Sequence, residues 1–177
     1  MTRSVKLSVL AAFALTTACA SENPTAPMFD GGIAAAKSAN KQVTRPAGGS
    51  CTTNIHSAVP TPTALILDMT GQCQLKHLGR TTIVIHQECS FIDGSCANST
   101  TSTAANGDIL YSTWYSAPGQ NTFDGLHAVF AGTETYAGGT GRFEGATGSS
   151  FASGTATLDP VTGGFTGQYK IKGTITF

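Results

Sequence analysis

AGGTGRFEGATGSS, residues 137–150, is the glycine-dense stretch around which the rest of the chain is organised. Glycine adopts backbone conformations that other residues avoid, and tight turns and bent strands require such conformations. Because a run of alternating apolar and polar residues comes after it, we predict that this stretch forms a turn and a corner of an antiparallel β structure. Phe143, the one aromatic residue within it, is predicted to anchor the corner in the core.

The C-terminal segment GFTGQYKIKGTITF, residues 164–177, has the clearest strand pattern. From Phe165 onward the odd-numbered residues are apolar or glycine, and the even-numbered residues are threonine, glutamine or lysine. A strand with this period of two buries one face and exposes the other, as in an antiparallel sheet with a single core.

The preceding sequence predicts further strands at residues 65–69, 72–77, 81–88, 109–116, 126–137 and 149–158. Turns are predicted at Thr70-Gly71, at Asn106-Gly107-Asp108 and at DPVTGG, residues 159–164. The polar run ANSTTSTAANGD, residues 97–108, is predicted as a loop, and so is the glycosylation-type sequence ANST within it.

About eight strands without a helical pattern between them fit either a β-sandwich or a closed barrel. Glycines and small residues at inward positions favour the barrel, because its strands must bend and its interior tapers. We therefore expect an all-β domain over residues 51–177, built as a small antiparallel closed barrel.

The composition agrees with one all-β domain and excludes one class of partner. Hydrophobic residues are 40% of the 177-residue chain and charged residues only 11%, which suits a single core with few surface ion pairs. The formal net charge is zero, and removal of an N-terminal leader with Arg3 and Lys6 leaves about −2. Because no basic patch is present to neutralise phosphates, no nucleic-acid partner is expected.

Residues 1–19 have the features of a bacterial export signal. Arg3 and Lys6 form a basic region, and LSVLAAFAL, residues 7–15, is an apolar segment too short to span a bilayer. Two cleavage sites fit the residues after the apolar segment. LTTAC resembles a lipoprotein signal with Cys19 as the lipidated residue, although threonine stands where that signal has leucine, and Ala-Cys-Ala at residues 18–20 fits an ordinary secretory site.

Residues 20–50 are predicted to be a flexible tether, rich in proline, glycine, alanine and serine. The one competing pattern is a marginal helix at residues 34–42. About thirty flexible residues span roughly 30 Å, enough to hold a domain off a membrane. The tether favours the lipoprotein alternative, so we expect attachment to a cell-envelope membrane through Cys19, and otherwise a periplasmic or secreted protein.

Four cysteines remain after the leader, an even number suited to an oxidising compartment. Of the three possible pairings we favour Cys89 with Cys96, which bracket the turn-rich loop CSFIDGSC, and Cys51 with Cys73. The loop-entropy relation assigns these closures roughly 2.5 and 3.4 kcal/mol. A zinc site is the alternative use of the four cysteines, but no CxxC pair is present, so neither a metal nor another cofactor is expected.

Three segments together resemble a known family. GGTGRFEGATGS, followed by a strand, the DPVTG turn and a terminal strand, is similar to the GGTGRF signature of the allene oxide cyclase and dirigent barrels, and more closely to uncharacterised bacterial exported proteins with that barrel. Those proteins also carry an HLGR-type segment and an AANGD-type turn, which correspond to residues 77–80 and 104–108. The resemblance implies an eight-stranded antiparallel barrel of calycin type with an apolar interior for a small hydrophobic molecule.

The resemblance transfers a glycine corner and no catalytic residue. Two polar groups are candidates for the interior: His77, which shares the parity of Leu75, and Glu144. The other three histidines, His56, His86 and His127, lack metal-ligand spacing and are expected to be ordinary strand residues. The residues of the transferred corner are Gly138, Gly139, Gly141, Arg142, Phe143 and Gly145.

These patterns support two functions. The first is a non-catalytic exported barrel that binds a small apolar ligand or acts as a cell-envelope interaction module. The second is a cofactor-free enzyme of the cyclase or dirigent kind that works inside the barrel. A binder needs only an apolar lining, whereas an enzyme needs converging polar groups with perturbed pKa values. A fully packed interior is the third alternative, and no feature of the sequence specifies an oligomer.

Overall fold

The structure, a computed structural model, describes residues 42–177. This part of the chain contains a nine-stranded sheet and one short 3₁₀ helix. The elements are β1 (Thr44–Pro60), β2 (Ala64–Leu75), β3 (Gly79–Ser90), β4 (Cys96–Ala104), β5 (Ile109–Ser116), β6 (Thr122–Phe123), β7 (His127–Gly139), η1 (Gly141–Phe143), β8 (Thr147–Leu158) and β9 (Phe165–Thr176).

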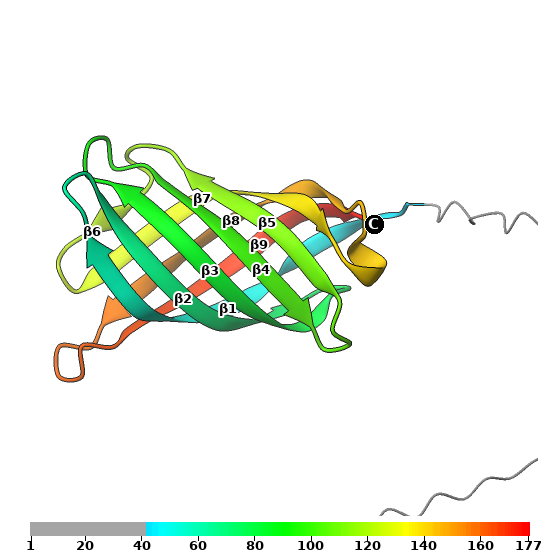
Figure 1. The fold of residues 1–177 in the computed structure, drawn as a ribbon, viewed down its shortest axis with the longest axis horizontal. Coiled ribbons are helices and arrows are strands. Elements are labelled where there is room, and N and C mark those ends of the chain that lie inside the picture. Colours follow the sequence, from blue (N-terminus) through cyan, green and yellow to red (C-terminus); the bar gives the residue numbers. More distant parts are fainter. Residues whose placement is uncertain (1–41) are drawn as a thin grey trace, which may run out of the picture. The chain divides into compact units, whose positions relative to one another are not determined.

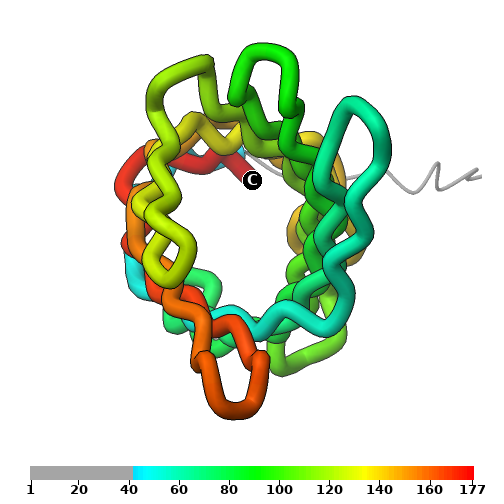
Figure 2. The backbone as a smooth tube through the Cα atoms, turned by 90° about the vertical axis from the view of Figure 1, so that its left-hand side faces the viewer, coloured from blue at the N-terminus to red at the C-terminus, as the bar shows by residue number. Residues whose placement is uncertain are grey.

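Eight of the strands form a closed antiparallel barrel, as predicted. Consecutive strands pair from β1 to β5 and again from β7 to β9, and the pairs β1–β9 and β5–β7 close the ring. The short β6 pairs with β7 near its start, beyond the part of β7 that β5 contacts. Figure 1 shows the strands inclined to the long axis of the barrel, and Figure 2 shows the backbone as a closed ring.

The alternation predicted for the last strand is confirmed in β9. Gly167, Ile171 and Ile175 are buried, whereas Lys170 and Lys172 between them are exposed. Because both β1 and β8 pair with β9 along most of its length, the register of this strand aligns the inward residues of three neighbouring strands.

The turn predicted at Thr70-Gly71 is wrong, because β2 runs without a break from Ala64 to Leu75. Gly71 instead marks a close approach of two strands, where a Cβ would overlap the carbonyl oxygen of Thr52 on β1. The hairpin turn comes later, at residues 76–78, and His77 within it has a φ of 63°.

The polar run predicted as a loop is wrong as well, because most of it forms strand β4. Thr100, Ser102 and Ala104 are its buried inward residues, and the strand pairs with β3 on one side and β5 on the other. Small polar residues occupy both faces of β4, so the alternation of hydrophobicity that identifies a strand is absent from its sequence. The ANST sequence therefore lies within a strand.

The barrel also begins earlier than predicted. Residues 44–50, assigned to the tether by their composition, belong to β1 and pair with β9 from Thr44 onward. Glycines at 48 and 49 conceal the strand pattern there. The predicted export signal, Cys19 and most of the predicted tether lie outside the described residues.

Both favoured disulfides are confirmed. Cys51–Cys73 joins directly paired residues of β1 and β2, and Cys89–Cys96 joins directly paired residues of β3 and β4. Each bond therefore links a strand pair that sheet hydrogen bonds already hold. Two disulfides in one small domain fit an oxidising, extracellular environment.

The glycine corner closes one end of the barrel. Phe143 in η1 has no solvent exposure, and its ring packs edge-on against Phe177 with 5.2 Å between the centroids. The prediction that Phe143 anchors the core is confirmed. The other buried residues of this cluster, named here the closed-end cluster, are Ala47, Leu78, Ala104, Leu110, Tyr136, Ala146 and Ile175.

The three segments that carry the family resemblance meet at this closed end. Arg142 lies over the Phe143 ring, with its Cζ 4.7 Å from the centroid, and donates from Nη2 to the Leu78 carbonyl oxygen at 3.1 Å. Its Nε lies 3.6 Å from Oδ2 of Asp108, in the turn between β4 and β5. Gly141 has a φ of 57°, and a Cβ there would overlap the Asp108 carboxylate. The motif residues therefore connect η1 with the β2–β3 and β4–β5 turns at the closed end of the barrel.

Candidate functional site

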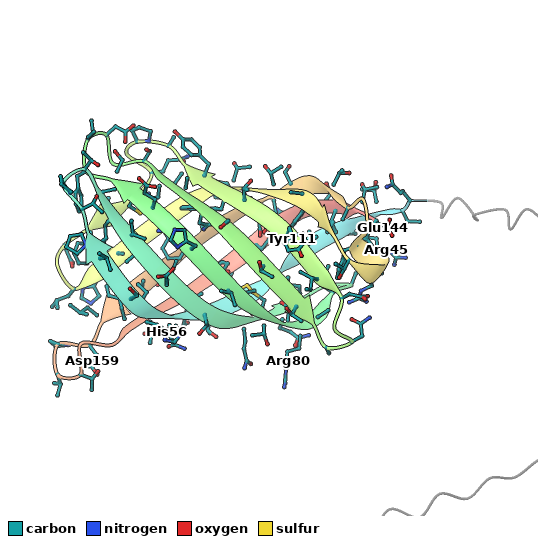
Figure 3. All side chains as sticks on the ribbon, viewed as in Figure 1. Arg45, His56, Arg80, Tyr111, Glu144 and Asp159 are labelled. Carbon is teal, nitrogen blue, oxygen red and sulfur yellow. A yellow bond between two sulfur atoms is a disulfide. The ribbon has the colours of Figure 1, made fainter. Side chains whose placement is uncertain are left out.

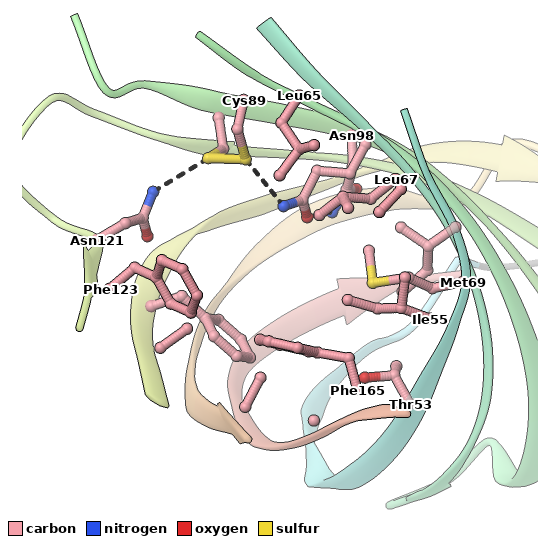
Figure 4. A pocket seen from close by; sticks show the side chains of 18 of the residues that line it. Thr53, Ile55, Leu65, Leu67, Met69, Cys89, Asn98, Asn121, Phe123 and Phe165 are labelled. Atoms are coloured by element: carbon pink, nitrogen blue, oxygen red, sulfur yellow. Dashed lines mark hydrogen bonds between the residues drawn. A yellow bond between two sulfur atoms is a disulfide. The ribbon is translucent and has the colours of Figure 1, made fainter. Parts of the chain in front are cut away.

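The opposite end of the barrel opens into a cavity of about 610 Å³. Its mouth lies among the loops that follow β3, β5 and β8. Figure 4 shows side chains from several strands converging on it, among them Ile55, Leu67, Met69 and Phe165. This volume is within the range of sites that hold small organic molecules.

Aromatic side chains form much of the cavity wall. Trp114 of β5 and Tyr169 of β9 both pack edge-on against Phe130 of β7, with centroid distances of 6.4 and 6.0 Å. Phe123 and Phe165 lie 6.3 Å apart between centroids and also line the cavity. The wall therefore offers large apolar faces to a ligand.

Small residues create the empty space. Ala156 of β8 and Gly167 of β9 are directly paired and both face the lumen, where longer side chains would fill it. Gly132 of β7 accommodates the indole of Trp114, because a Cβ there would lie 2.5 Å from Trp114 Cε2. An eight-stranded barrel is just wide enough to be filled or to hold a ligand, and this barrel is filled at the η1 end and hollow at the other.

Glu134 of β7 is the one carboxylate among the residues that line the cavity in the described part of the chain. Ser112 of β5 donates a hydrogen bond to its Oε1 at 2.7 Å, and Ser150 of β8 donates to its Oε2 at 3.1 Å. The hydroxyl of Tyr136 donates in turn to Ser150 Oγ at 3.1 Å. Three hydroxyl groups therefore surround one acidic group at the inner end of the cavity.

Burial changes the acid–base properties of this group. Desolvation raises the pKa of Glu134 above its ordinary value, and the hydrogen bonds from Ser112 and Ser150 oppose that shift only in part. Desolvation also raises the pKa of Tyr136 and of Tyr169, and the nearby Glu134 charge adds to both shifts. The tyrosine hydroxyls therefore stay neutral donors at physiological pH.

The two polar residues predicted for the interior are exposed. His77 lies in the β2–β3 turn, because β2 ends at Leu75 and the parity does not continue beyond it. Glu144 comes after η1 on the outside of the closed end, where Figure 3 labels it.

The remaining histidines do not enter the interior either. His86 and His127 are exposed, as expected for ordinary strand residues. His56 is exposed at the mouth of the cavity, in a bulge of β1, where it hydrogen-bonds with Thr70.

Glu134 is the interior residue that sequence reasoning missed. In the predicted strand at residues 126–137, Phe130 and Tyr136 share one face, and Glu134 has the same even parity between them. That parity was the available signal, and a lone carboxylate among inward aromatic residues marks a functional candidate.

The mouth of the cavity has an apolar rim and a disulfide in its wall. The loop residues Phe91, Ile92 and Val161 are 58%, 80% and 90% exposed. Beside them, the Cys89–Cys96 disulfide lies against two amide side chains, as Figure 4 shows. Gln87 donates to Cys89 Sγ at 3.1 Å and Asn121 to Cys96 Sγ at 3.3 Å.

Two other kinds of site are absent from residues 42–177. This part of the chain has no group of three or more histidine, cysteine, aspartate or glutamate residues able to hold a metal ion. It also has no helix long and apolar enough to cross a membrane.

The fold and the site define a closed eight-stranded antiparallel barrel with an apolar cavity at one end and a hydrogen-bonded carboxyl group inside it. Comparison with protein-family models, with curated proteins and with solved structures finds no match.

Proposed function

We propose that this protein is a non-catalytic binding barrel that holds one small apolar molecule in the cavity. The observation that carries the proposal is the hollow half of the barrel, about 610 Å³ of space lined mainly by aromatic and aliphatic side chains. An empty apolar cavity of this size costs stability, since its lining lacks packing partners. A ligand that fills the space restores those contacts.

The single tryptophan of the chain makes the proposal testable, because Trp114 lines the cavity. The hydrocarbon diphenylhexatriene has no polar group and accepts energy from excited tryptophan. Titrating it into the protein is expected to quench Trp114 emission saturably, with one probe bound per chain.

A matched pair of variants on β8 locates the binding site. Ala156 faces the cavity and Thr157 faces solvent, so an Ala156→Phe variant fills the cavity and a Thr157→Phe variant does not. We expect the first substitution to abolish quenching and the second to leave it unchanged. Equal binding by both variants would place the probe outside the barrel and contradict the proposal.

The second candidate function is a cofactor-free enzyme of the cyclase or dirigent kind, in keeping with the resemblance of the glycine corner. The cluster of Glu134, Ser112, Ser150 and Tyr136 favours it, because a carboxyl group with a raised pKa suits general acid–base chemistry. Mass spectrometry of a bound molecule after prolonged incubation separates the two candidates. A binder releases the molecule unchanged, and an enzyme releases an isomer or product.

We further propose that the barrel is exported and held at a cell-envelope membrane by lipid on Cys19. The leader-like sequence at residues 1–19 and the disulfides of the barrel support this location. A Cys19→Ser variant is expected to move from the membrane fraction to the soluble envelope fraction. An unmodified N-terminus at Ser21 in the wild-type protein would contradict lipidation.

A further inference from the structure

We propose that the ligand is an amphipathic organic cation, an apolar molecule with a single amine whose nitrogen is bound by Glu134 inside the cavity. This inference rests on the proposed binding function and adds the chemical class of the ligand. The supporting observations are the position of the Glu134 carboxylate, the hydrogen-bond donors around it, and the lack of a counter-charge among the described residues that face it.

Glu134 lies at the inner end of the cavity. It is the innermost cavity-lining residue of β7, whereas Ala128 and Phe130 of the same strand lie nearer the mouth. It is directly paired with Trp114 on β5 and with Ser150 on β8, so its side chain enters the lumen between an indole and a hydroxyl. A ligand that fills the cavity therefore ends at this carboxylate.

The hydrogen-bond donors around Glu134 orient it and leave room for a further donor. Each carboxylate oxygen already accepts one hydrogen bond from a serine, and Ser150 itself accepts from Tyr136. These contacts hold the carboxylate in one orientation as an acceptor. A carboxylate oxygen accepts two hydrogen bonds, so each retains one acceptor site for a ligand group that donates.

Glu134 has no counter-charge among the described residues. No lysine or arginine lines the cavity within residues 42–177, and none of the ion pairs in that part of the chain includes Glu134. A partly buried carboxylate without a counter-charge is destabilising, which agrees with the raised pKa of this group. An ammonium group supplies the missing charge, and a second carboxylate brought by a fatty acid adds repulsion.

The aromatic wall favours a cation as well. Trp114, Phe130 and Tyr169 lie together beside the inner end of the cavity, and aromatic faces attract ammonium groups. Such pairs are stronger when they are removed from water. A neutral alcohol also donates to Glu134 but gains neither the charge pair nor the aromatic attraction.

The titratable groups that face Glu134 are few. Tyr136 on its own strand and Tyr169 on β9 both stay neutral, because burial raises their pKa values. The neighbouring strands β5 and β8 present Ser112, Trp114 and Ser150 to it, none of which titrates. Inward cysteines of β1 to β4 are disulfide-bonded, and His56 lies at the mouth. Binding of an amine therefore depends on the ionisation of Glu134.

Three ligands that share one hydrocarbon chain test the inference. Decylamine, decan-1-ol and decanoate share a ten-carbon chain and differ in the head group. The affinity of each ligand for the wild-type protein is measured at pH 8 by displacement of diphenylhexatriene. Each ligand is kept below its own critical micelle concentration. We expect decylamine to bind at least tenfold more tightly than decan-1-ol, about 1.4 kcal/mol, and decanoate to bind least.

Two carboxylate variants provide the matched comparison. Glu134→Gln removes the charge inside the cavity, and Glu144→Gln removes the same charge from the exposed surface. The amine preference, measured in each protein as the ratio of the decylamine and decan-1-ol affinities, should disappear in the first variant and persist in the second. The Glu144→Gln variant should also bind diphenylhexatriene like the wild type. In the wild type, the preference should also weaken as the pH falls and Glu134 takes up a proton.

The outcomes separate this inference from the function on which it rests. Equal binding of decylamine and decan-1-ol by the wild type, or a preference that survives Glu134→Gln, overturns the amine proposal and leaves the binding barrel in place. Failure of diphenylhexatriene and of all three probes to bind, measured also by calorimetry, overturns both.

Discussion

Replacing Phe143 with alanine tests how the barrel is closed. The ring is fully buried, packs against Phe177 and lies under the Arg142 guanidinium. Truncating a buried phenylalanine costs about 3–5 kcal/mol, so we expect a loss near 4 kcal/mol in the free energy of unfolding. For a domain of this size that loss lowers the melting temperature by about 8–16 °C.

Urea titration with the disulfides intact, followed by Trp114 fluorescence, measures this loss. Phe151→Ala on β8 is the matched control, because that ring is 48% exposed on the outer face. The control should cost no more than about 1 kcal/mol, the span of exposed strand propensities. If the two alanine variants differ by less than about 1 kcal/mol, the glycine corner does not close the core and the interpretation of the motif is wrong.

Three further perturbations address the disulfides, the aromatic wall and the interior carboxyl group. Replacing Cys51 and Cys73 with alanine should lower the free energy of unfolding by about 3.4 kcal/mol, and replacing Cys89 and Cys96 should lower it by about 2.5 kcal/mol. The first loss is larger because the first bond closes the longer loop. Urea titrations that reverse this order would contradict the dependence on loop length. Gly132→Val should displace the Trp114 indole and shift its emission to longer wavelength, whereas Thr133→Val, at an exposed position, should not. An unchanged spectrum in Gly132→Val would refute the close contact between Gly132 and Trp114. Burial raises the pKa of Glu134 in the folded state above 4.5, so as the pH rises the carboxyl group ionises in the unfolded chain before it ionises in the folded protein. The free energy of unfolding should therefore fall as the pH rises above 4.5 and level off above the folded-state pKa. Glu134→Gln should lack this decline in pH-dependent urea titrations, and a decline that persists in the variant would have another origin.

Much of the barrel could be predicted from local patterns. In β9, apolar and glycine residues alternate with lysine and threonine, because one face of the strand is buried and the other is exposed. The glycine corner could be recognised because only glycine tolerates the backbone conformation and close contact at Gly141. The disulfide pairing could be predicted from the short loop between Cys89 and Cys96.

The errors arose where local patterns do not determine structure. Strand β4 is polar on both faces and is held by hydrogen bonds from β3 and β5, which are tertiary contacts. Gly71 looked like a turn residue, but it is required by the close approach of β1. The prediction that His77 lies inside is wrong because the alternation of β2 ends at Leu75, before the turn that contains His77.

The cavity depends on a property of the whole ring that no single segment displays. Ala156 and Gly167 leave space only because they are directly paired on neighbouring strands and because the closed-end cluster does not extend that far. Glu134 gains its significance from Ser112 and Ser150, which lie on two other strands. Such a site emerges only when the strands are placed in register.

Native mass spectrometry of the protein purified from its own host without denaturation tests the central claim, that the cavity holds a ligand, most directly. We predict one non-covalent small molecule per chain, released on unfolding, absent from Ala156→Phe and present in Thr157→Phe. Acyl chains on Cys19 would remain attached after unfolding, so the same spectra distinguish them from a ligand. A bare protein mass for the wild type, with no more bound ligand than Ala156→Phe, would contradict the claim.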